Sequence, residues 1–129
     1  MSDSHASHNS ILLDHFLNPR NIGDVPDADG VGEVGAVSCG DVIRISIKVA
    51  DGRITDARFR TYGCGTAIAT SSMATELIKG RTLNEASKFS GEQLSAAFGG
   101  IPPAKAHCPV LAEEAVKAAA ADYLRRHAT

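Results

Sequence analysis

Residues 61–66, TYGCGT, join a predicted β-strand to a predicted α-helix and place a cysteine between two glycines. Gly63 and Gly65 have no Cβ, so the backbone can turn sharply there and a bulky group can approach the thiol closely. The helix that follows directs its unsatisfied N–H groups and the positive end of its dipole towards Cys64, which favours thiolate over thiol. Because a thiolate is both a nucleophile and a metal ligand, this junction predicts thiol chemistry.

The strand that enters this junction belongs to a predicted hairpin. Isoleucines alternate with polar residues over 43–49, and residues 54–62 return as the partner strand after the turn-forming pair Asp51-Gly52. A change of phase in the second strand indicates a bulge near residues 55–56. A weaker strand covers 32–38, so the sequence predicts three strands.

Helical spacing predicts five helices around these strands. They are a helix from Asn9 or Ser10 to Asn18, one over 66–79, two short helices with capping boxes at Thr82–Glu85 and Ser90–Gln93, and one from Pro109 to about His127. This order predicts an α+β fold, with a small three-stranded antiparallel sheet packed against about five helices. We predict a flexible tail over residues 1–9 and a single domain over 10–129.

The composition of the 129 residues is that of an ordinary soluble domain, with 43% hydrophobic and 22% charged residues. A net charge of −2 gives no electrostatic reason to expect a nucleic acid or an anionic membrane as a partner. No apolar run approaches the roughly 20 residues that span a bilayer, and the polar opening lacks the features of a secretory signal. Three cysteines, an odd number, favour reduced thiols over a disulfide framework and therefore a cytoplasmic location.

All three cysteines lie in loops at the ends of predicted elements: Cys39, Cys64 and Cys108. A hairpin places the start of its first strand beside the end of its second, so we expect Cys39 and Cys64 to meet at one end of the sheet. The sequence does not place Cys108, which begins the last helix. A single cysteine is usually a small buried apolar residue, but three in glycine-flanked or helix-starting loops favour a shared thiolate site.

Two further potential metal ligands, Asp41 and His107, flank the cysteines. Five candidate ligands then compete for about four positions around zinc or cluster iron, which suits metal delivery better than storage. The alternatives are an Asx turn for Asp41 and a solvated loop position for His107. Lys105 is either an ordinary surface lysine or a cation that supports thiolate charge. The other histidines are expected at the surface: His5, His8, His15 and His127.

Three segments resemble the signature segments of the iron–sulfur cluster assembly scaffold family, which comprises IscU and the N-terminal domain of NifU. They are GAVSCGD at 35–41, TYGCGTAIA at 61–69 and IPPAKAHC at 101–108, and NPRN at 18–21 resembles the exit of the family's first helix. The resemblance implies the SufE/NifU-like fold. It also implies a non-enzymatic scaffold that assembles a labile [2Fe–2S] cluster from iron and desulfurase-derived persulfide sulfur, then transfers it to acceptor proteins.

The same resemblance implies a role for each candidate residue. The cluster, or zinc in the cluster-free form, is expected to bind Cys39, Asp41, Cys64, His107 and Cys108, with Cys108 as the persulfide acceptor. The implied partners are a cysteine desulfurase, a ferredoxin-like electron donor, a frataxin-like regulator and acceptor apoproteins. An Hsp70-type chaperone and its J-type co-chaperone are expected to recognise residues 101–105.

Two other functions fit the same residues. A zinc-bound sulfurtransferase would relay persulfide without ever carrying a cluster. A structural zinc module would use the metal only to stabilise its fold, and chelation would then unfold it.

Overall fold

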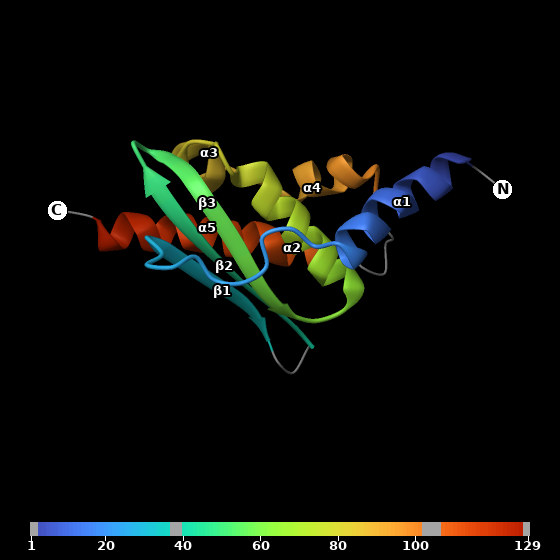
Figure 1. The fold of residues 1–129 in the computed structure, drawn as a ribbon, viewed down its shortest axis with the longest axis horizontal. Coiled ribbons are helices and arrows are strands. Elements are labelled where there is room, and N and C mark those ends of the chain that lie inside the picture. The colour runs from blue at the N-terminus through green and yellow to red at the C-terminus, as the bar shows by residue number, and fades with distance from the viewer. Residues whose placement is uncertain (1–2, 37–39, 102–106, 128–129) are drawn as a thin grey trace.

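A computed structural model describes residues 3–36, 40–101 and 107–127. These ranges form a three-stranded antiparallel sheet, ordered β1-β2-β3, and five helices (Figure 1), which confirms the predicted fold class. The elements are α1 (Asp3–Leu17), β1 (Gly30–Ala36), β2 (Asp41–Ala50), β3 (Arg53–Tyr62), α2 (Gly65–Ile78), α3 (Leu83–Ser87), α4 (Gly91–Phe98) and α5 (His107–Arg126). None of the helices in these ranges is long and apolar enough to cross a bilayer.

The β2–β3 hairpin has the turn and the bulge that the sequence predicts. Asp51 and Gly52 have φ angles of 54° and 75°, the left-handed values that a two-residue hairpin turn requires. The register of the two strands shifts after Lys48, and Thr55 is the extra residue on β3. The hairpin therefore sets the start of β2, at Asp41, close to the end of β3.

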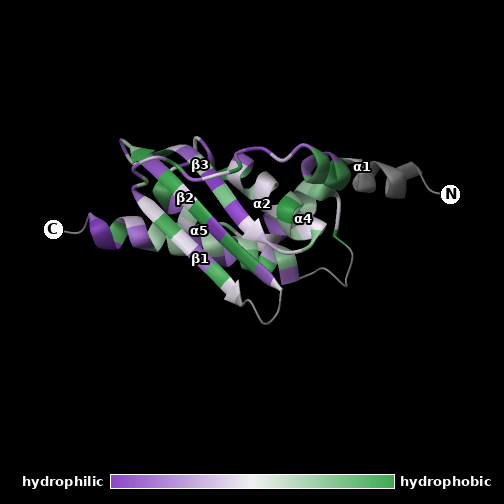
Figure 2. Cartoon of the chain, turned by 60° about the horizontal axis from the view of Figure 1, so that its bottom comes forward, coloured by the Kyte–Doolittle hydropathy of each residue, from purple (hydrophilic) through white to green (hydrophobic). Residues whose placement is uncertain are grey.

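The core lies between the sheet and the two long helices α2 and α5, which cover the same face of the sheet (Figure 1). Apolar and polar residues alternate along β2 and β3 (Figure 2), so each strand has one face towards this core. The core includes Ile43, Ile45 and Ile47 of β2, Ala57 and Phe59 of β3, Ala74 and Ile78 of α2, and Ala112, Val116 and Ala119 of α5.

Helix α5 packs directly against the backbone of β1 because that strand presents glycines to it. A Cβ on Gly32 would lie less than 3.0 Å from the carbonyl oxygen of Ala115 and the nitrogen of Ala119. A side chain at this position would push α5 away from the sheet. The close packing fixes α5 across the sheet and thereby positions its first turn, which carries His107 and Cys108.

Two helix starts and one helix cap differ from the predictions. Helix α1 begins at Asp3, so it includes part of the segment 1–9 that we predicted as a tail; the flexibility of that segment and the domain boundary at residue 10 remain predictions. Helix α5 begins two residues before Pro109. The Thr82–Glu85 capping box is confirmed, but Ser90 makes no side-chain cap bond in the described part of the chain. Instead, Gly91 N–H donates to Glu113 Oε1 of α5 at 2.7 Å.

The prediction that His15 lies at the surface is wrong, because only 8% of this residue is exposed. Its Nδ1 is 2.8 Å from Ser72 Oγ on α2, and its ring meets that of Phe98 on α4 edge to face. Burial lowers the pKa of His15, and the charge of Arg20 lowers it further. His127 is exposed as predicted. The prediction for His5 and His8 concerns side chains that the structure does not describe.

Candidate metal and thiol site

Cys64 is the N-cap residue of α2, at the strand-to-helix junction that the sequence predicts. Its φ and ψ of −75° and 171° are extended, and its carbonyl accepts the N–H groups of Ala67 and Ile68 at 3.0 and 3.2 Å. The thiol is half-buried, and it lies where the helix presents its positive end. The local backbone therefore favours a negative charge at Cys64.

Cys108 lies in the first turn of α5 and has no exposed surface. Its Sγ is 4.0 Å from Cys64 Sγ, although the two residues are 44 positions apart. The structure thus supplies the placement that the sequence left open, and it brings both thiols to one point. The neighbouring His107 is half exposed, and its Nε2 is 3.6 Å from Cys108 Sγ.

Asp41, the first residue of β2, connects the two thiol-bearing segments. Its Oδ2 is hydrogen-bonded to His107 Nε2 at 2.6 Å, and its Oδ1 accepts the N–H of Cys64 at 3.3 Å. Only 8% of Asp41 is exposed. The ligand atoms of Asp41, His107 and Cys108 all lie within 4.8 Å of one another, so these side chains could share one metal ion.

The other two predicted site residues, Cys39 and Lys105, lie outside the described residues. The expectation that Cys39 meets Cys64 therefore stays a prediction. The strand arrangement on which this expectation depends is present, because Val42 pairs with Tyr62 and the beginning of β2 therefore lies against the end of β3.

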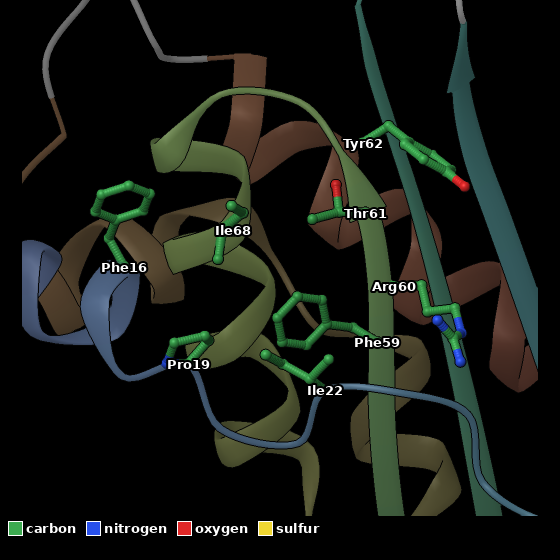
Figure 3. Close-up of a pocket in the computed structure, with 8 residues that line it drawn as sticks. All are labelled: Phe16, Pro19, Ile22, Phe59, Arg60, Thr61, Tyr62 and Ile68. Carbon is green, nitrogen blue, oxygen red and sulfur yellow. The ribbon is translucent and has the colours of Figure 1, made fainter.

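An apolar groove of about 290 Å³ lies beside the β3–α2 junction and was not predicted from the sequence. Phe16, Ile22 and Ile68 gather on one side of β3, whereas Tyr62 points to the other side (Figure 3). The Phe16 ring also covers Gly65, where a Cβ would lie 2.9 Å from it.

The fold and the site define a small α+β domain that gathers thiol, carboxylate and imidazole ligands at one end of its sheet. Residues 7–129 match the family model described as "NifU-like N terminal domain". The chain belongs to this family, as the resemblance of its three segments predicts.

Curated relatives of this chain are named as scaffold proteins. It is 53% identical over 116 residues to "Iron-sulfur cluster assembly scaffold protein IscU 1" of Archaeoglobus fulgidus, covering 90% of this chain and 76% of that protein. It is 55% identical over 116 residues to the IscU scaffold protein of Azotobacter vinelandii, covering 87% and 90%. The Escherichia coli K12 IscU scaffold protein is 51% identical over 116 residues, covering 87% and 90%.

Solved structures share the fold at lower sequence identity. A NifU-like N-terminal protein of Brucella abortus superimposes with a TM-score of 0.72 and 21% identity, covering 97% of this chain and 99% of that one. A scaffold protein for the SUF system from Fervidobacterium islandicum gives a TM-score of 0.70 and 21% identity, covering 91% and 98%. These two structures are similar to this chain in fold.

Proposed function

We propose that this protein is a scaffold on which a labile [2Fe–2S] cluster is assembled from iron and desulfurase-derived persulfide sulfur, and from which acceptor proteins take the cluster. The observation that carries the proposal is the convergence of Asp41, Cys64, His107 and Cys108 from three distant parts of the chain. The scaffold names of relatives about half identical to this chain support it and favour it over the sulfurtransferase alternative.

The spacing of the two sulfurs is suited to one shared ion. Two thiolates about 2.3 Å from a tetrahedral ion lie about 3.8 Å apart, and Cys64 Sγ and Cys108 Sγ are 4.0 Å apart. We assign Cys39 as the third thiolate on the basis of the family motif. Thiolates are the ligands of iron in iron–sulfur clusters, so these three cysteines form the stable part of the ligand set.

Asp41 and His107 are the exchangeable part. Their side chains are hydrogen-bonded to each other at 2.6 Å, so an ion that binds these atoms must replace the hydrogen-bonded proton. A carboxylate oxygen is a harder ligand than a thiolate and holds cluster iron less strongly. A cluster with Asp41 in its ligand set is therefore weakly held, which allows an acceptor to remove it.

Sulfur enters through Cys108. Its thiolate attacks the outer sulfur of a desulfurase persulfide; a new S–S bond forms on Cys108, the old S–S bond breaks, and the desulfurase cysteine leaves as a thiolate. The thiol proton can pass to His107 Nε2, which is 3.6 Å from Cys108 Sγ, once that nitrogen no longer donates to Asp41. An external electron donor then supplies two electrons, which split the Cys108 persulfide into sulfide and thiolate. Because Cys108 is buried, the site must open during this step.

The remaining roles follow the family. Zinc is proposed to occupy the same ligands in the cluster-free protein, and Lys105 to support thiolate charge. The scaffold would work with a cysteine desulfurase and acceptor proteins, and with a ferredoxin-like donor, a frataxin-like regulator and an Hsp70-type chaperone pair that recognises residues 101–105. Its chemistry needs reduced thiols and therefore a cytoplasm-like compartment.

Anaerobic reconstitution with ferrous iron, L-cysteine, a cysteine desulfurase and a thiol reductant as the electron donor tests the proposal. The expected product is red-brown, absorbs in the visible range, contains iron and sulfide in equal amounts, and converts an apo-ferredoxin to its cluster-bound form. A colourless protein that keeps zinc and still passes on labelled sulfur would support the sulfurtransferase instead. A protein that accepts no sulfur and unfolds on chelation would support the structural zinc module.

A further inference from the structure

The Asp41 carboxylate occupies the space next to the Cα of Gly63, where any other residue would have its Cβ. A Cβ built on Gly63 would lie less than 3.0 Å from Asp41 Oδ1 and 3.3 Å from Asp41 Cγ. Non-bonded atoms in proteins do not approach so closely. The carboxylate therefore cannot keep its present position if residue 63 has a side chain.

The backbone conformation does not explain this glycine. Gly63 is not one of the described glycines with a positive φ, so its φ does not require a glycine. Gly40, close by, is the opposite case: its φ is +79° and nothing lies within 4 Å of its Cβ position. Gly40 is needed for its conformation, whereas Gly63 is needed for the space that it leaves.

From this space the carboxylate reaches both thiol-bearing segments, through its bonds to Cys64 N–H and to His107 Nε2. We propose that Gly63 is the positioning residue of Asp41: its missing Cβ seats the carboxylate between the Cys64 loop and the first turn of α5. The effect on cluster lifetime rests on the proposed scaffold function. The effect of Gly63 on the geometry of the cluster-free site does not depend on the scaffold function.

An alanine at position 63 should move the carboxylate and leave the strand in place. The Ala67 Cβ lies 3.2 Å from the added atom on another side, so the new methyl group has little room to move away. The backbone of Asp41 is held in the β1–β2 ladder opposite Ala36. The carboxylate is the end of a side chain with two rotatable bonds, so it moves first and gives up its two hydrogen bonds.

The first test uses the cluster-free, metal-free protein labelled with ¹⁵N histidine, compared at one pH and temperature. Gly63→Ala is expected to shift the His107 ring nitrogens to the positions seen in Asp41→Ala. Gly65→Ala is the matched control on the other side of Cys64, because its Cβ would meet the Phe16 ring instead; it should keep the wild-type His107 signals. Wild-type His107 signals in Gly63→Ala, with shifted ones in Asp41→Ala, would overturn the inference.

The second test separates positioning from general damage with a double-mutant cycle. Gly63→Ala and Asp41→Ala are each expected to lengthen cluster lifetime at least two-fold, and the double variant to add nothing further. A Gly63→Ala effect of equal size with and without Asp41 would contradict positioning. If Gly63→Ala alone fails to fold, rescue of folding by Asp41→Ala supports the inference, and failure of rescue overturns it. If even the wild type assembles no cluster, the proposed function falls, and the His107 spectra still decide the inference.

Discussion

His107 Nε2 and Asp41 Oδ2 are 2.6 Å apart, and this bond joins a half-exposed imidazole to a nearly buried carboxylate. The two residues are 66 positions apart in the chain, at the start of β2 and the start of α5. A metal ion that bound His107 Nε2 would have to displace this hydrogen bond, so Asp41 would compete with the ion for the imidazole.

Asp41→Ala is predicted to make the cluster last longer, because it removes the proposed oxygen ligand, which holds cluster iron less strongly than a thiolate does. The measurement is the decay of visible absorbance in air after anaerobic reconstitution. Asp24→Ala is the control, since Asp24 is an exposed carboxylate paired with Arg60 on the sheet. Unchanged or faster decay in Asp41→Ala would contradict the lability argument.

Cys108→Ser is predicted to abolish sulfur acceptance, because a serine hydroxyl is not ionised at neutral pH and cannot form the persulfide. The measurement is transfer of ³⁵S from a labelled desulfurase, read on a non-reducing gel. Cys64→Ser should still accept the label but should not hold a cluster. Label on Cys108→Ser would mean that another cysteine receives the sulfur.

The stability of the protein is predicted to fall as the pH is lowered through the ordinary histidine pKa of 6.5, in part because of His15. Burial lowers the pKa of His15 in the folded state, so the unfolded chain binds the proton more readily and gains stability relative to the fold at acidic pH. His15→Asn keeps a polar group that can bond Ser72 but does not titrate in this range. Thermal unfolding between pH 5.5 and 8 should depend less on pH in this variant; an equally steep dependence would exclude His15.

Gly32→Ala is predicted to destabilise the protein by about 3 kcal/mol or more, because the new methyl group meets the backbone of α5, which cannot move aside cheaply. Urea unfolding measures the loss. Glu33→Ala, on the next residue of β1 and exposed to solvent, is the control and should change stability by no more than about 0.5 kcal/mol. Equal effects of the two substitutions would show that α5 tolerates a side chain at position 32.

Local patterns predicted much of this fold. The Asp51-Gly52 turn, the bulge and the Thr82–Glu85 capping box each depend on a few neighbouring residues, and all three are present. The convergence of Cys108 on Cys64 could not be predicted, because it depends on how α5 crosses the sheet at the β1 glycines. The cap of α4 also depends on the position of α5, because Glu113 of α5 accepts the Gly91 N–H, and it could not be predicted for that reason.

His15 illustrates a second limit of sequence patterns. Its neighbours in the chain are exposed leucine and phenylalanine residues, so nothing local distinguishes it as a buried group. Only the docking of α1 against Ser72 and Phe98 gives it a polar partner and an aromatic contact. The space that Gly63 leaves for Asp41 is of the same kind, since it is created by two segments that meet only in the folded chain.

The thiols of Cys64 and Cys108 differ in burial, and this difference sets the order in which they would react with a reagent in solution. Cys64 is partly accessible, whereas Cys108 is shielded completely. A small alkylating reagent such as iodoacetamide should therefore modify Cys64 well before Cys108. Brief treatment would yield a preparation that has lost one proposed cluster ligand yet retains the proposed sulfur-accepting residue intact.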